Sequence, residues 1–112
     1  MLELTEKHVA ALHLLRENDF EIVAFPMYAN HVGIRRGEYA LLLAAADDSH
    51  FQIFGDPSLL LGENISVRVK RDGKQLFVWK KNQAEATPAR LEALAQFRAD
   101  VLRILASLAQ NQ

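Results

Sequence analysis

The sequence of 112 residues contains no cysteine. Thiol catalysis, disulfide bonds and zinc sites built on cysteine are therefore excluded. It also lacks a long apolar run, because the longest, residues 39–46, is far shorter than the roughly 20 residues that cross a bilayer as a helix. The first residues show no pattern typical of a secretory signal, so the sequence predicts a cytoplasmic protein without a membrane segment.

Neither charge nor glycine is concentrated enough to indicate a ligand. Lysine and arginine number 13 against 14 aspartates and glutamates, and the net charge of −1 excludes a globally basic nucleic-acid binder. The five glycines are scattered and none opens a helix, so no phosphate-binding loop can be assembled. A content of 50% hydrophobic and 24% charged residues is typical of a globular protein, which we expect to form a single domain over residues 1–112.

Helix signals lie near both ends of the chain. Thr5 is a predicted N-cap for a helix that ends near Glu17, because its hydroxyl can accept from amides that the first turn leaves unpaired. Thr87 followed by Pro88 predicts the start of a second helix, which an apolar stripe extends to Leu108.

Strand signals fill the region between the two helices. Runs rich in apolar, aromatic and β-branched residues predict strands at 20–25, 39–45 and 50–54, and the composition of 39–45 is typical of a central strand buried on both faces. Residues 55–58 predict a turn. Residues 27–38 predict a loop or an irregular edge strand, because Gly33 and Gly37 interrupt a weak alternation.

The clearest local signal is a hairpin with strands at 64–71 and 74–81. Asp72 and Gly73 suit a two-residue type I′ turn, which fixes the register of the strands. On the side expected to face the core, this register sets Val67 opposite Val78, Val69 opposite Leu76 and Ile65 opposite Lys80. The other side sets Arg68 opposite Phe77, Lys70 opposite Gln75 and Ser66 opposite Trp79.

Together these elements predict an α+β fold with an N-terminal helix, an antiparallel sheet of four to five strands and a long C-terminal helix packed on one face. The C-terminal helix is longer than the strands, so we expect part of its stripe to find a second copy of the chain. The predicted dimer interface consists of Leu94, Phe97, Val101, Ile104, Leu105 and Leu108.

The hairpin also supports an alternative function in nucleic-acid binding. Six basic residues and one acidic residue lie in 64–81, a local charge of +5 that leaves −6 for the rest of the chain. Aromatic side chains beside positive charge can hold single-stranded nucleic acid, and the residues concerned are Arg68, Lys70, Phe77, Trp79 and Lys81. The competing interpretation is that the aromatics pack beneath the terminal helix while the lysines protect an edge hairpin.

A second alternative places a small-molecule site or an enzyme in the irregular segment 27–38. Its candidate ligand-binding residues are Tyr28, Asn30, His31 and Arg35, since rigid scaffolds often present functional groups from such segments. We predict no metal site and no cofactor. His8 and His13 are five residues apart and so cannot share an ion from one helix.

No catalytic constellation is found, so the leading hypothesis is a small non-catalytic intracellular interaction module that homodimerises. Its expected partner is a second copy of itself, nucleic acid is the weaker alternative, and no membrane partner is expected.

Overall fold

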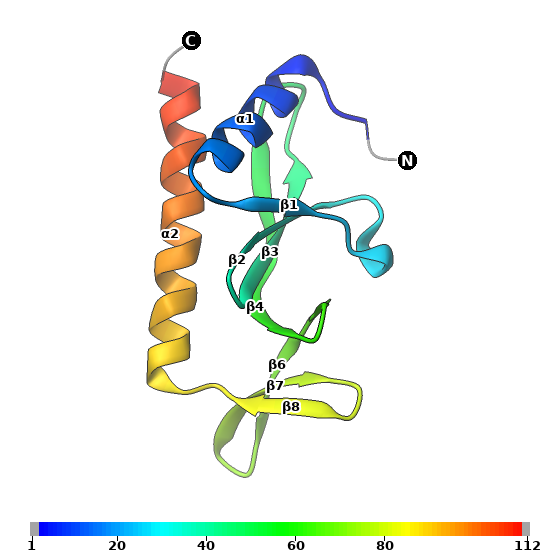
Figure 1. Cartoon of the computed structure of the whole chain (residues 1–112), viewed down its shortest axis with the longest axis vertical. Helices are drawn as coiled ribbons and strands as arrows, with labels where there is room; N and C mark the ends of the chain where they lie inside the picture. The colour runs from blue at the N-terminus through cyan, green and yellow to red at the C-terminus, as the bar shows by residue number, and fades with distance from the viewer. Residues whose placement is uncertain (1–2, 111–112) are drawn as a thin grey trace.

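The computed structural model describes residues 3–110, which form two helices, a short 3₁₀ turn and eight strands (Figure 1). The elements in chain order are α1 (Glu6–Glu17), β1 (Glu21–Val23), η1 (Pro26–Tyr28), β2 (Val32–Arg36), β3 (Tyr39–Ala45), β4 (Phe51–Leu61), β5 (Asn64–Ile65), β6 (Val67–Arg71), β7 (Lys74–Trp79), β8 (Asn82–Glu85) and α2 (Pro88–Gln110). The fold is α+β, as predicted.

The strands form two antiparallel sheets. The first has the order β1-β2-β3-β4-β5, and the second, smaller sheet has the order β6-β7-β8. The molecule is elongated, with extents of 48 × 28 × 21 Å, and α2 runs along one side from the small sheet to the level of α1 (Figure 1). Within residues 3–110, neither helix combines the length and the apolar character that a membrane span requires.

The helices cover one face of the five-stranded sheet. Leu41 and Leu43 of β3 are fully buried there against Phe97 and Val101 of α2. We call this cluster the helix-covered core; its buried members are Leu15, Phe20, Val32, Ile34, Leu41, Leu43, Phe97, Val101 and Ile104. Burial of such side chains removes apolar surface from water at roughly 25 cal/mol per Å² and is the main force that joins helices to sheet.

An ion pair closes the edge of this core. The Arg36 guanidinium lies 4.8 Å from the ring centre of Phe20 and 5.6 Å from that of Phe97, and donates to the Asp100 carboxylate over 2.9 Å. Gln96 also donates to Asp100. These two hydrogen bonds, Arg36 first, lower the pKa of Asp100 below the ordinary range of an aspartate.

The opposite face of β3 carries a second cluster, to which neither α-helix contributes. Leu42 and Ala40 pack there with Phe25, Leu60 and Ile65, and the partly buried Val23 and Tyr28 border them. β3 therefore is a central strand buried on both faces, as the composition of 39–45 predicts.

The prediction of a loop or an irregular edge strand for 27–38 is confirmed for 27–31, which contain η1 and a turn. It is wrong for 32–36, because β2 is an interior strand paired with β1 on one side and β3 on the other. Gly33 does not break the strand. A Cβ atom at Gly33 would lie 2.5 Å from the Phe25 ring and 2.6 Å from the Val23 carbonyl oxygen. The glycine therefore lets the Phe25 ring lie directly on the sheet.

The turn predicted at 55–58 is also wrong. These residues continue β4, which extends over Phe51–Leu61. Gly55 adopts a φ of +70°, and the register between β3 and β4 shifts between Ala40 and Leu42. The turn-forming residues thus make a bulge that bends the strand instead of reversing the chain.

The hairpin register is confirmed, but its predicted core side is wrong. Val67 pairs with Val78 and Arg68 with Phe77, yet Phe77 is fully buried while Val67 is 54% exposed. The Phe77 side faces inward because it packs on Leu59 and on Leu94 of α2. Further pairings also differ from the prediction, since Ile65 pairs with Leu60 rather than with Lys80, and an unpredicted β8 follows β7.

Both predicted helix starts are confirmed. The Thr5 hydroxyl accepts from the backbone N–H of His8, and the His8 ring accepts in return from the backbone N–H of Thr5. The Thr87 hydroxyl accepts from the backbone N–H of Arg90 over 3.2 Å. Such caps satisfy amides that a helix leaves unpaired.

Candidate functional site

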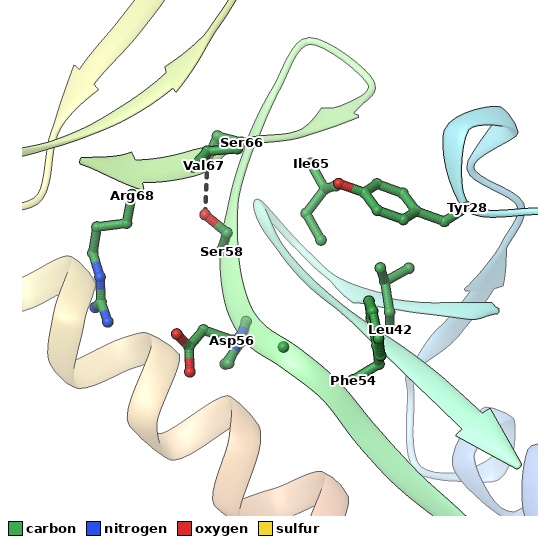
Figure 2. Close-up of a pocket in the computed structure, with 11 residues that line it drawn as sticks. Tyr28, Leu42, Phe54, Asp56, Ser58, Ile65, Ser66, Val67 and Arg68 are labelled. Carbon is green, nitrogen blue, oxygen red and sulfur yellow. Dashed lines mark hydrogen bonds between the residues drawn. The ribbon is translucent and has the colours of Figure 1, made fainter.

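β4 and β6 form a fork on the face of β3 that lies opposite the helices. β4 and β5 pair through Leu60 with Ile65 and Leu61 with Asn64, and the Ser66 backbone N–H donates to the Leu59 carbonyl over 3.2 Å. Beyond these contacts β4 bends into the five-stranded sheet, whereas β6 joins the small sheet (Figure 2). The two strands therefore separate and leave a groove between them.

We call this hollow the fork groove; its volume is about 400 Å³. Its lining is about equally polar and apolar. The apolar part comes from Tyr28, Leu42, Phe54, Ile65 and Val67, and the polar side chains are Asp56, Ser58, Ser66 and Arg68 (Figure 2). A cleft that offers both apolar contacts and polar groups to an occupant is a candidate binding site.

Exposed apolar side chains gather at this groove. Phe54 is 49% exposed and Val67 is 54% exposed, and both line it. Met27, which is 68% exposed, lines a smaller neighbouring hollow of about 220 Å³ together with Trp79. Tyr28 and Ile65 border both hollows, so the two hollows adjoin and their exposed apolar side chains lie close together on the surface.

The two serine hydroxyl groups in the groove are bonded to protein partners. Ser66 Oγ donates to the Leu59 carbonyl over 2.5 Å, and Ser58 Oγ lies 2.8 Å from Ser66 Oγ. Because the Ser66 proton is used, Ser58 is the donor in that second bond. Neither bond involves a base that could activate a serine as a nucleophile. This pair holds the base of the fork together.

The predicted small-molecule residues are only partly brought together. Tyr28 lines the fork groove, and its ring lies 6.4 Å from that of His31, which in turn stacks on Phe54 at 4.1 Å. The buried His31 Nδ1 has no hydrogen-bond partner among the described residues. Arg35 lines a different hollow and donates to the Gly37 carbonyl, and Asn30 is exposed in the turn before β2.

The predicted nucleic-acid residues are also divided. Phe77 is fully buried beneath α2, so its ring cannot stack on a base. Trp79 is half-buried and lies 5.6 Å from the Lys80 ammonium. The basic side chains of the hairpin are all exposed, and none of them forms an ion pair within the part of the chain that the structure describes. These are Arg68, Lys70, Arg71, Lys74, Lys80 and Lys81.

Most of the predicted dimer residues pack within their own chain. Leu94, Phe97, Val101 and Ile104 are buried against the sheets, with exposed fractions of 6% or less. Leu105 and Leu108 are half-buried. Leu102, which the prediction does not include, is 38% exposed. The stripe that suggested a dimer is therefore used mainly to hold α2 on the sheets.

The N-terminus of α1 is tied to the β3–β4 turn. His8 is 2% exposed, its ring stacks on Phe51 at 4.8 Å, and its Nε2 donates to the His50 carbonyl over 3.1 Å. In the turn, hydrogen bonds from the Ser49 backbone N–H and then from the His50 side chain lower the pKa of Asp47. The hydrogen bonds of the His8 ring with Thr5 and His50 account for its burial, because buried polar groups in proteins are normally hydrogen-bonded.

Within residues 3–110, no three histidine, aspartate or glutamate side chains are grouped so that they could hold a metal ion. A search of protein-family models, of curated proteins and of solved structures found no match to this chain.

Proposed function

We propose that this protein is a non-catalytic interaction module that binds a protein partner in the fork groove. The observation that carries the proposal is the gathering of exposed apolar side chains at one place. Five large hydrophobic side chains are exposed among the residues that the structure describes, and three of them, Phe54, Val67 and Met27, lie at the fork groove or the hollow beside it. Contiguous exposed apolar surface with a polar rim is characteristic of docking sites.

The chemistry of the groove supports binding rather than catalysis. Its serines are bonded to each other and to a carbonyl, and its charged side chains, Asp56 and Arg68, lie at the rim. A hydrolytic site requires a nucleophile in contact with a base, and the groove residues supply no such pair.

A displayed library of random peptides, selected on the immobilised chain, tests this proposal. We expect selected peptides to lose binding to a Phe54→Ser/Val67→Ser variant, because it removes the exposed apolar wall. The control is Val9→Ser, which changes an exposed hydrophobic on α1, away from both the groove and the expected dimer surface, and should retain binding. Recovery of only those peptides whose binding survives the groove substitutions would overturn the proposal.

The homodimer stays a prediction. The surface that α2 offers to a second copy is narrower than the stripe suggests, and we expect it to centre on Leu102 with Leu105 and Leu108. Light scattering coupled to size exclusion at micromolar concentration checks it. A mass of twice 12.6 kDa supports the dimer, and a mass of 12.6 kDa contradicts it.

A further inference from the structure

The outer edge of β6 has no strand beside it in the described structure. The small sheet has the order β6-β7-β8, so β6 is paired on one edge only. The residues of this edge strand are exposed apart from the half-buried Val69. Unpaired strand edges can accept an additional strand from another chain.

The ladder pattern identifies which backbone groups are free. The Ala86 N–H donates to the Gln75 carbonyl, so the backbone of Gln75 faces β8. Because backbone groups alternate in direction along a strand, Leu76 and Val78 face β6, where Val69 and Val67 are their partners.

The same alternation turns the backbone groups of Arg68 and Lys70 away from β7. They face the side on which Ser66 donates to Leu59 of β4. β4 leaves this side at the fork (Figure 2). Arg68 and Lys70 therefore continue a hydrogen-bonding edge that has no strand beside it.

We infer that the partner segment is an extended peptide in which acidic residues alternate with apolar ones, added as a strand to the outer edge of β6. This inference rests on the proposed function, since Val67 and Arg68 belong both to the edge and to the fork groove. Residues opposite Arg68 and Lys70 lie on the same face as these side chains and are acidic. Residues opposite Val67 and Val69 lie on the other face and are apolar.

Charge decides between occupants of the edge. The hairpin region 64–81 carries +5, and its basic side chains have no ion-pair partner within the described part of the chain. A second copy of β6 would place basic residues opposite Arg68 and Lys70, which is unfavourable. A nucleic acid would gain no stacking from the buried Phe77. An acidic strand can form hydrogen bonds with the free backbone groups of β6 and ion pairs with its basic side chains.

Synthetic peptides of about eight residues, the length of an ordinary strand, provide the first test. A peptide that alternates glutamate with valine is compared with a lysine–valine peptide and with a peptide of the same composition in which glutamates and valines form separate blocks. The single tryptophan, Trp79, lies in the adjoining hollow and reports binding by fluorescence. We expect the alternating glutamate peptide to bind about tenfold more tightly than either control, because two cross-strand charge pairs each contribute a few-fold.

Backbone methylation tests the strand pairing itself. In an antiparallel ladder, the residues opposite Arg68 and Lys70 exchange hydrogen bonds with them, and these are the glutamates. N-methylation of the glutamate amides should therefore abolish binding, whereas N-methylation of the valine amides should preserve it and prevent self-association of the peptide. Equal binding of the two methylated peptides would overturn the inference.

Charge reversal tests the specificity. The Arg68→Glu/Lys70→Glu variant should no longer bind the glutamate peptide and should bind the lysine peptide instead. Lys7→Glu/Arg98→Glu makes the same change in net charge at exposed sites on the helices and should leave the glutamate peptide bound within about twofold, since distant charges are screened. Circular dichroism establishes that each variant is folded.

The outcomes separate this inference from the proposed function. Library peptides that require Phe54 and Val67 but are uncharged or helical would leave the interaction module standing and overturn the acidic strand. Tighter binding of a single-stranded oligonucleotide than of the glutamate peptide would overturn it in favour of nucleic acid. Loss of glutamate-peptide binding in the Lys7→Glu/Arg98→Glu control would also overturn it, because net charge alone would then explain the binding.

Discussion

The two faces of β3 carry similar side chains but have different covers. Leu41 and Leu43 are enclosed by the helices, and an ion pair between Arg36 and Asp100 closes the edge of that core. Leu42 lies on the opposite face, where no α-helix residue joins the cluster and exposed side chains remain at the fork. The comparison separates surface that stabilises the fold from surface that is free to bind.

The largest expected effect compares two neighbouring positions on α2. Ile104 is 6% exposed and belongs to the helix-covered core, whereas Leu102 is 38% exposed. Ile104→Glu removes a buried side chain and introduces an unpaired charge, so we expect a loss of at least about 4 kcal/mol in the free energy of unfolding. Leu102→Glu should cost less than about 1 kcal/mol, because its site already contacts water.

Urea denaturation followed by circular dichroism measures both variants. If the chain dimerises through the outer side of α2, Leu102→Glu should also halve its mass in light scattering while leaving it folded. Similar stability losses for the two variants would show that the difference in burial on α2 does not govern its packing.

A smaller effect is expected at Gly33, on the second face. The added Cβ of Gly33→Ala would meet both the Phe25 ring and the Val23 carbonyl oxygen at 2.5–2.6 Å. Because the backbone oxygen cannot swing away, we expect a loss of about 1–3 kcal/mol in the free energy of unfolding. In a double-mutant cycle, Phe25→Leu should reduce the cost of Gly33→Ala, since it removes the ring from the contact. Strict additivity would contradict this packing account.

The ion pair at the edge of the helix-covered core predicts a pH dependence. The pKa of Asp100 is lowered in the folded chain, so its contribution to stability is present at neutral pH and is lost as the pH falls below about 4. The wild type should therefore have a higher urea midpoint than Asp100→Asn at pH 7, and this difference should disappear at pH 3. Glu92→Gln, which removes an exposed carboxylate elsewhere on α2, is the control. A difference in midpoint that persists at pH 3 would show that the ionised Asp100 carboxylate is not the source of this stability.

Local signals in the sequence predict the fold well where both interacting groups belong to the same short segment. Thr5 and Thr87 cap their own helices, and the Asp72-Gly73 turn sets the register of β6 and β7. The strand at 39–45 is predicted because a short, uninterrupted apolar run is typical of a strand buried on both faces. In the caps and the hairpin turn, the interacting groups lie close together in the sequence.

Features that depend on distant residues are the ones that the sequence does not predict. In the sequence, Gly33 indicates a break in a strand, but in the fold it makes room for the Phe25 ring. Gly55 indicates a turn, but in the fold it lies in a bulge of β4 beside β3. The core side of the hairpin depends on Leu94 of α2, which buries Phe77. Tyr28 of the fork groove is among the predicted site residues, but no local signal shows that Phe54 and Val67 meet there.

The smallest expected effect is that of Phe54→Ala, which is measured against Phe20→Ala on the opposite face. Phe20 is 3% exposed and lies against Phe97, and Phe20→Ala should cost about 3–5 kcal/mol. Phe54 is 49% exposed and its main aromatic contact is His31 at 4.1 Å, so Phe54→Ala should cost no more than about 1 kcal/mol. Urea midpoints at neutral pH measure both. If Phe54→Ala proved as costly as Phe20→Ala, the Phe54 ring would be needed to hold the sheet together. Its exposure would then no longer indicate a docking site. A small cost combined with loss of peptide binding is the result that assigns the ring to a partner.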